Sequence, residues 1–147
     1  MTIALRHAEV VWNGSLAAGE GSVSSQSGAL ELAVSWASRT EQPDGKTSPE
    51  ELIAAAHASC FAMALALVLG ENHTPPECLA VSAACTLDEV DGAPRITTIQ
   101  LTVQARVPSL DAKGLEDNVQ RAAELCPVSN ALRGNVEIAV RSQLDQA

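Results

Sequence analysis

Aromatic side chains and positive charge are scarce in this chain of 147 residues. Trp12, Trp36 and Phe61 are its only aromatic residues, and its formal net charge at pH 7 is −9. Nucleic acids bind basic surfaces and stack their bases on aromatic rings, and anionic membrane surfaces attract basic segments. The composition therefore argues against binding to nucleic acid or to a membrane surface.

The sequence also lacks a linker rich in proline, glycine and serine, an internal repeat and a block of like charge. A length of 147 residues is typical of one domain. Hydrophobic residues make up 46% of the chain and charged residues 18%, which provides enough apolar surface for a core and too little charge for disorder. We expect a single domain over residues 1–147.

No signal peptide is visible, because the first residues contain no basic segment followed by a long apolar run. The expected compartment is the reducing cytoplasm, where thiols stay free unless they are catalytic, metal-bound or redox-sensing. No C-x-x-C pair is present and the histidines have no regular spacing, so we predict no metal site, and no cofactor is predicted either.

Turn signals and hydrophobic periodicity divide the chain into strands and helices. Strands are expected over residues 4–12, 20–27, 29–37, 78–90, 95–107 and 135–141. Helices are expected over residues 49–69, from a cap at Asp111 to residue 125, and over residues 127–132. Because the strands cluster rather than alternate with helices, the predicted fold class is α+β with a largely antiparallel sheet that begins as a meander of three strands.

The clearest helix start lies at Ser48, a favourable N-cap that precedes Pro49 at the first helical position and Glu51 at the capping-box position. We expect Gly70 to end this helix. Residues 52–69 carry no formal charge and approach the ~20 residues of a membrane span, but many alanines and the lack of a basic flank argue against one. A helix buried on nearly every side needs more cover than one small domain supplies, so we expect an intimate homodimer.

Cys60 lies in the middle of this helix, and His57 lies three residues earlier on the same helical face. Either Cys60 is a small buried hydrophobic residue with an unreactive thiol, or His57 activates it. His57 is equally well interpreted as a space-filling side chain with one nitrogen bonded to backbone.

Cys126 precedes Pro127 at a helix start, where the helix dipole and free N–H groups stabilise a thiolate. It begins a C-x-x-S sequence, and it is equally well interpreted as an N-cap. Cys78 and Cys85 are seven residues apart, so they face opposite sides of a strand. Neither has a ligand-like companion, and both are predicted to be packing residues.

Two motifs resemble the OsmC/Ohr family of bacterial thiol peroxidases. The segment TSPEELIAAAHASCFAMAL, which starts at Thr47, resembles the central helix of that family. The segment CPVSNAL, which starts at Cys126, resembles its second cysteine motif, and the separation of 66 residues from Cys60 is similar too. WNGSL at Trp12 and GAPRITTI at Gly92 also match, so the resemblance covers nearly the whole chain.

The resemblance implies an intertwined α+β homodimer in which antiparallel sheets wrap around a long buried central helix, with sites at the interface. It also implies a thiol-dependent hydroperoxide reductase with Cys60 as the peroxidatic thiolate and Cys126 as the resolving thiol. By similarity to OsmC, Arg39 holds the thiolate and Glu50 orients the arginine. His57 and the segment SWASR make the chain closer to the osmotically inducible OsmC branch, which implies a role in osmotic and oxidative stress.

The implied substrate is an organic hydroperoxide, with hydrogen peroxide reduced less well, and the implied reductant is an external dithiol such as a lipoyl protein. The alternative is a non-catalytic structural or small-ligand-binding dimer. Glu50 and Cys60 are ten residues apart, which is ~15 Å along a straight helix. Either Arg39 bridges part of that gap or Glu50 serves the partner subunit, and our hypothesis is that each site mixes groups from two chains.

Overall fold

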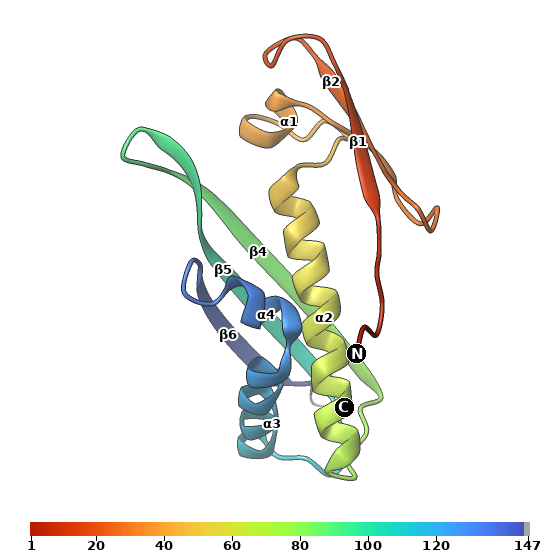
Figure 1. Cartoon of the computed structure of the whole chain (residues 1–147). Coiled ribbons are helices and arrows are strands. Elements are labelled where there is room, and N and C mark those ends of the chain that lie inside the picture. Colours follow the sequence, from red (N-terminus) through yellow and green to blue (C-terminus); the bar gives the residue numbers. More distant parts are fainter. Residues whose placement is uncertain (146–147) are drawn as a thin grey trace. The chain divides into compact units, whose positions relative to one another are not determined.

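The computed structural model describes residues 1–145, which fall into two compact units. The first unit is Met1–Leu52, and the second begins at Ile53. The helix α2 (Pro49–Glu71) begins in the first unit and continues in the second (Figure 1). Each unit contains a three-stranded sheet, so the expected α+β class is confirmed. Of the domain expected over residues 1–147, residues 146–147 lie outside the described part of the chain.

The first unit contains the expected antiparallel meander of three strands, which are β1 (Ala8–Asn13), β2 (Glu20–Ser25) and β3 (Glu31–Val34). Trp12 of β1 pairs with Gly21 of β2. A Cβ atom on Gly21 would lie 2.8 Å from Val34 Cγ1 and 2.9 Å from Trp12 Cε3, closer than packed carbons approach. Glycine at this position therefore lets the Trp12 ring pack over the β2 backbone.

The strand expected over residues 29–37 is wrong at its end, because β3 stops three residues earlier and a short helix, α1 (Trp36–Thr40), follows. Ser35 is the N-cap of α1. Its hydroxyl accepts a hydrogen bond from the Ser38 N–H at 3.0 Å, and the Ser38 hydroxyl accepts one from the Ser35 N–H at 2.9 Å. This reciprocal capping box satisfies N–H groups that a helix start leaves unpaired, and it puts Arg39 in the last turn of α1.

Helix α2 begins where the sequence predicts, and Ser48 Oγ accepts a hydrogen bond from the Glu51 N–H at 3.1 Å. The Glu51 carboxylate accepts a hydrogen bond from the Thr47 hydroxyl at 2.8 Å, rather than completing the expected capping box. The predicted end is wrong, because Gly70 lies inside the helix. The chain leaves the helix through His73, which has a φ of +61°. A left-handed residue after the last turn is a common helix stop, and histidine tolerates it better than most residues.

The second unit contains β4 (Cys78–Val90), β5 (Ala93–Arg106) and β6 (Glu137–Leu144) in the order β4–β5–β6. The antiparallel strands β4 and β5 are joined at Asp91 and Gly92, whose φ values of 52° and 79° are those of a hairpin turn. Strands β5 and β6 are parallel, the exception to the expected antiparallel pairing. Parallel strands need a long crossover, which the helices α3 (Ala112–Leu125) and α4 (Pro127–Leu132) supply.

The core of the second unit is built by one face of α2 together with β5 and α3. Its fully buried side chains include Phe61, Leu65, Leu69, Ile99, Leu101, Val103 and Leu115. These three elements therefore hold the middle of α2 in a defined position, which matters for Cys60.

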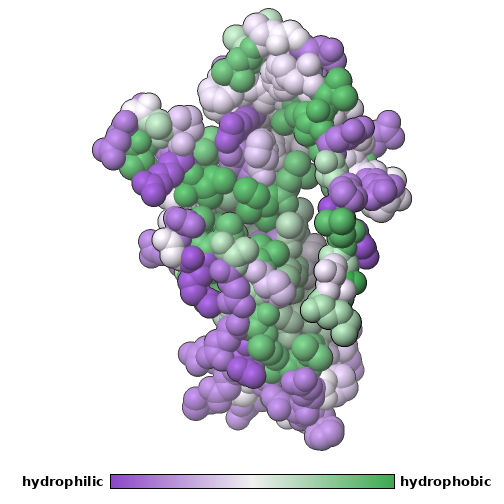
Figure 2. Space-filling view, viewed as in Figure 1, coloured by the Kyte–Doolittle hydropathy of each residue, from purple (hydrophilic) through white to green (hydrophobic). Residues whose placement is uncertain are grey.

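The opposite face of α2 is left uncovered by residues 1–145. Met63 is 71% exposed and Leu67 is 56% exposed. By length and composition α2 is apolar enough to cross a membrane, although the core helix of a soluble protein passes the same test. Exposed hydrophobic side chains are also present in the first unit, as the green areas of Figure 2 show, and they include Val10, Val11, Trp12, Leu16 and Leu32. The expected burial of α2 on nearly every side is therefore not met within residues 1–145.

Candidate functional site

In the first unit, Arg39 and Glu50 form an ion pair through several contacts. Arg39 Nη2 donates to Glu50 Oε1 at 2.7 Å, and Arg39 Nε lies 3.0 Å from Oε1 and 3.2 Å from Oε2. The Glu50 side chain is 8% exposed and that of Arg39 is 30% exposed. Such a multiple contact fixes the plane of the guanidinium as well as its charge. Arg39 Nη1 makes no hydrogen bond within residues 1–145, so one edge of the guanidinium stays available.

Local contacts explain why these two side chains meet. The Ser38 hydroxyl donates to the Thr47 carbonyl at 2.8 Å, and both residues are buried. This bond ties α1 to the residues that precede α2. Arg39 directly follows Ser38, and Glu50 lies three residues after Thr47. The Arg39 guanidinium carbon also lies 5.9 Å from the centre of the Trp36 ring, within the range of a cation–π contact.

An apolar hollow of about 340 Å³ lies beside Arg39 in the first unit. Its lining is mostly apolar and includes Val10, Trp12, Leu16, Val34, Trp36 and Leu52. Arg39 is the one charged residue among the lining side chains that the structure describes. A volume of this order is typical of small-molecule pockets. The hollow therefore suits a ligand with an apolar body and a polar group that arginine can bind.

In the second unit, α2 and the start of α4 bring Cys60 and Cys126 into contact. The two thiols hydrogen-bond each other, and the Val128 N–H hydrogen-bonds the Cys60 sulfur. Cys60 is half-buried and Cys126 is fully buried, and both are free thiols. Burial raises the pKa of the Cys60 thiol, the Val128 N–H lowers it, and the neighbouring Cys126 raises it again. Because the net effect is a raised pKa, an added cation is needed to make Cys60 a thiolate at neutral pH.

Cys126 is the N-cap of α4, as one of its two interpretations predicts, and its sulfur accepts a hydrogen bond from the Ser129 N–H at 3.5 Å. The Ser129 hydroxyl pairs with His57 Nε2 at 2.7 Å. His57 therefore bonds a side chain rather than the backbone. Its Nδ1 atom has no hydrogen-bond partner in the described part of the chain, so no bond from His57 activates Cys60. Sequence reasoning missed Ser129, which lies 72 residues from His57, although it belongs to the CPVS motif.

The other two cysteines both lie on β4. Cys85 packs against the core of the second unit, as predicted. Cys78 is exposed, so its prediction as a packing residue is wrong, because it lies at the first position of β4 on the uncovered face. Among residues 1–145, no group of three or more His, Cys, Asp or Glu side chains could hold a metal ion.

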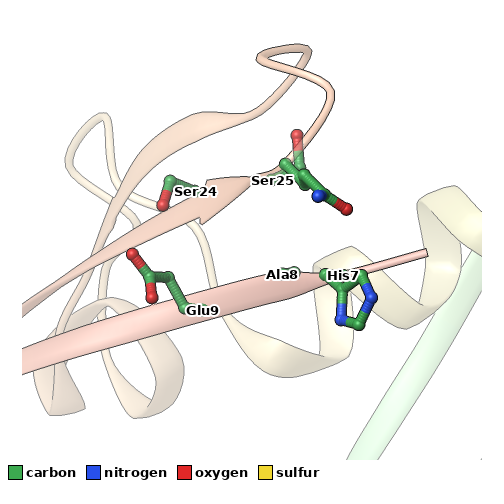
Figure 3. Close-up of a pocket in the computed structure, with 6 residues that line it drawn as sticks. His7, Ala8, Glu9, Ser24 and Ser25 are labelled. Atoms are coloured by element: carbon green, nitrogen blue, oxygen red, sulfur yellow. The ribbon is translucent and has the colours of Figure 1, made fainter.

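A second hollow, of about 400 Å³, lies at the edge of β1 and β2 (Figure 3). Figure 3 shows the Glu9 carboxylate on the side of Ser24, with the His7 ring turned away from both. Its lining residues are exposed or half-buried, and none is a cysteine or an arginine. This hollow therefore offers neither a thiol nor a guanidinium.

The structure thus places the four predicted site residues in two pairs. Arg39 and Glu50 are together in the first unit, and Cys60 and Cys126 are together in the second. These features define an α+β protein with two thiols in contact across two helices and a separately held arginine. The family profile described as "OsmC-like protein" matches residues 42–141, and the chain belongs to this family.

Three relatives show how far the similarity extends. The chain is 41% identical to peroxiredoxin OsmC of Escherichia coli over 128 residues, which is 86% of this chain and 89% of that protein. It is similar to the crystal structure of the organic hydroperoxide resistance protein OhrB of Bacillus subtilis, with a TM-score of 0.77 and 30% identity, covering 95% of this chain and all of that one. The OsmC-like protein of Mycoplasma pneumoniae has the same fold at 15% identity, with a TM-score of 0.79.

Proposed function

We propose that this protein is a hydroperoxide reductase that uses Cys60 as its peroxidatic thiol and Cys126 as its resolving thiol. The similarity to peroxiredoxin OsmC and to organic hydroperoxide resistance proteins supports a peroxidase-type enzyme. The observation that carries the two-cysteine proposal is the contact between the Cys60 and Cys126 thiols. Two thiols in contact can form a disulfide without a large movement of either helix.

The proposed reaction has three steps. The Cys60 thiolate attacks the distal oxygen of the hydroperoxide, the O–O bond breaks, and the alkoxide takes a proton and leaves as the alcohol. Cys60 is then a sulfenic acid. The Cys126 sulfur attacks the Cys60 sulfur, the S–S bond forms, and the sulfenic hydroxyl leaves as water with the Cys126 proton. An external dithiol, for which a lipoyl protein is our candidate, reduces the disulfide by exchange.

Arg39 is the proposed cation that offsets the raised pKa of Cys60. A guanidinium stays charged when it is desolvated and offers several donors to a thiolate and a peroxide oxygen. Glu50 holds one edge of Arg39 and leaves Nη1 for this task. We propose that the apolar hollow beside Arg39 receives the alkyl group of an organic hydroperoxide, and that hydrogen peroxide, which has no such group, is the poorer substrate.

A homodimer completes this proposal. It would cover the exposed Met63 and Leu67 on α2 with a second protein chain rather than with lipid. Ten helical residues separate Glu50 from Cys60, a rise of ~15 Å on the unbroken α2. We therefore propose that Arg39 and Glu50 of one chain serve Cys60 of its partner. A cytoplasmic location and a role in osmotic and oxidative stress belong to the same proposal.

The experiment that tests the function is a thiol count. Reduced protein is treated with one equivalent of cumene hydroperoxide, and the remaining thiols are titrated under denaturing conditions. We expect the wild type to lose two of its four thiols, and Cys60→Ser to lose none. Cys78→Ser is the matched control, because Cys78 is an exposed cysteine outside the pair, and it should still lose two. An unchanged thiol count in the wild type would support the alternative, a non-catalytic structural or ligand-binding dimer.

A further inference from the structure

His57 is a buried polar residue that the proposed mechanism does not use. It lies on α2, one helical turn before Cys60, and its exposed fraction is 0%. A side chain of this kind costs free energy unless it is hydrogen-bonded. Its one partner in the described chain is the hydroxyl of Ser129, which is itself 2% exposed. The bond therefore joins the helix that carries Cys60 to the helix that Cys126 caps.

Among residues 1–145, one nitrogen of the His57 ring is hydrogen-bonded and the other is not. Burial lowers the pKa of His57, so the ring is neutral at pH 7 and has a single N–H. Nδ1 has no partner, whereas Nε2 lies 2.7 Å from Ser129 Oγ. Nε2 and Ser129 Oγ therefore share one hydrogen bond, in which the tautomer of the ring decides which atom donates.

Ser129 in turn contacts the second cysteine. Its backbone N–H donates to the Cys126 sulfur at 3.5 Å, in the first turn of α4. The hydrogen bonds thus run from His57 on α2 to Ser129, and from Ser129 to Cys126, whose thiol meets Cys60. This series of contacts begins at His57 and ends at Cys60, three residues later on α2.

We propose that His57 is a positioning residue that, through Ser129, holds the first turn of α4 against α2 and so keeps Cys126 directed at oxidised Cys60. This inference rests on the proposed function. It assigns His57 to the second step, in which the Cys126 thiol condenses with the Cys60 sulfenic acid and releases water. Attack of Cys60 on the peroxide depends less on α4, because only the Val128 N–H of that helix hydrogen-bonds the Cys60 sulfur, and the proposed Arg39 cation is unaffected. A slower second step leaves the sulfenic acid exposed to a second peroxide, which oxidises it to sulfinic acid.

The two steps are separated by rapid mixing of the full-length protein with cumene hydroperoxide. Peroxide consumption in the first turnover measures step one, and disulfide formation, followed by acid quench and mass spectrometry, measures step two. In His57→Leu and in Ser129→Ala we expect step one to stay within about twofold of wild type. We expect step two to slow by about three- to tenfold, as for the loss of one buried hydrogen bond. The sulfinic acid yield at excess peroxide should rise in parallel.

Two further variants separate positioning from packing. His57→Gln keeps an N–H donor near the position of Nε2, so it should recover most of the disulfide rate that His57→Leu loses. The double variant His57→Leu/Ser129→Ala removes the same bond as either single change, so it should be no slower than the slower single variant.

The proposal fails if His57→Leu forms the disulfide at the wild-type rate, or if His57→Gln is as slow as His57→Leu. It also fails if step one and step two slow equally, because His57 would then act on Cys60 itself. If His57→Leu does not fold, Ser129→Ala carries the same test. A wild-type protein that consumes no peroxide would instead contradict the proposed function, and that outcome is distinct from all of these.

Discussion

Replacing Glu50 by glutamine is expected to weaken the hold on Arg39 and to lower kcat/KM for the hydroperoxide. In the wild type the carboxylate accepts from Arg39 Nη2 at 2.7 Å and from Nε at 3.0 and 3.2 Å. Glutamine offers a single acceptor oxygen, and its NH₂ group would face the N–H donors of Arg39. The guanidinium therefore loses part of its contacts and the charge that fixes its orientation.

The size of the effect follows from burial. A solvent-exposed ion pair contributes about 0.2–1 kcal/mol, whereas breaking a fully buried pair costs about 3–5 kcal/mol. Glu50 is nearly buried at 8% exposed, but Arg39, at 30%, can recruit water when its partner is lost. We therefore expect about 1–3 kcal/mol, which corresponds to about a five- to 150-fold loss of kcat/KM if Arg39 acts in the transition state.

The assay is steady-state reduction of cumene hydroperoxide with dihydrolipoamide as the donor, at a temperature well below the melting point of each variant. Glu51→Gln is the matched control, because it removes one charge from the same helical turn and its carboxylate contacts Thr47 rather than Arg39. It should stay within about twofold of wild type, since the helix-dipole effect is common to both positions and small. If Glu50→Gln matches wild type while Cys60→Ser is inactive, the assignment of Glu50 is wrong.

Two further outcomes are expected. Mixed dimers of Cys60→Ser and Glu50→Ala subunits should contain one intact site if Glu50 serves the partner's Cys60. Tandem-purified mixed dimers should therefore be more active than either parent homodimer. Activity no higher than that of the parents would place Glu50 in its own chain's site. Burial lowers the pKa of His57 in the folded state, whereas its pKa in the unfolded state is about 6.5. At a pH between these two values the unfolded state binds more protons than the folded state. The free energy of unfolding in urea should therefore fall as the pH drops below about 6.5, by up to about 1.4 kcal/mol per pH unit from this group. His57→Leu should lack that component, and equal losses between pH 7.5 and 5.5 in both proteins would contradict it.

Much of the fold follows from local signals in the sequence. The Asp91–Gly92 turn, the start of α2 after Ser48 and the N-cap of α3 at Asp111 are encoded by residues within a few positions of each other. The errors arose where two local signals competed. At residues 35–38 a capping box outweighed an alternating pattern, and at the end of α2 the left-handed residue was His73 rather than Gly70.

Part of the candidate site could likewise be predicted from the sequence, and part could not. The motifs around Cys60 and Cys126 could be read from the sequence, because their residue types are distinctive and resemble a known family. The sequence by itself therefore determined the elements, the likeness to OsmC/Ohr proteins and the identity of the cysteines. The pairing of Arg39 with Glu50 was expected from the resemblance, but only the tertiary structure showed that the short helix α1 carries Arg39 to it. Only the tertiary structure decided that β5 and β6 are parallel and that His57 bonds Ser129 across 72 residues. Such pairings depend on which buried polar groups the packed core brings within hydrogen-bond distance, and no periodicity along the chain records that choice.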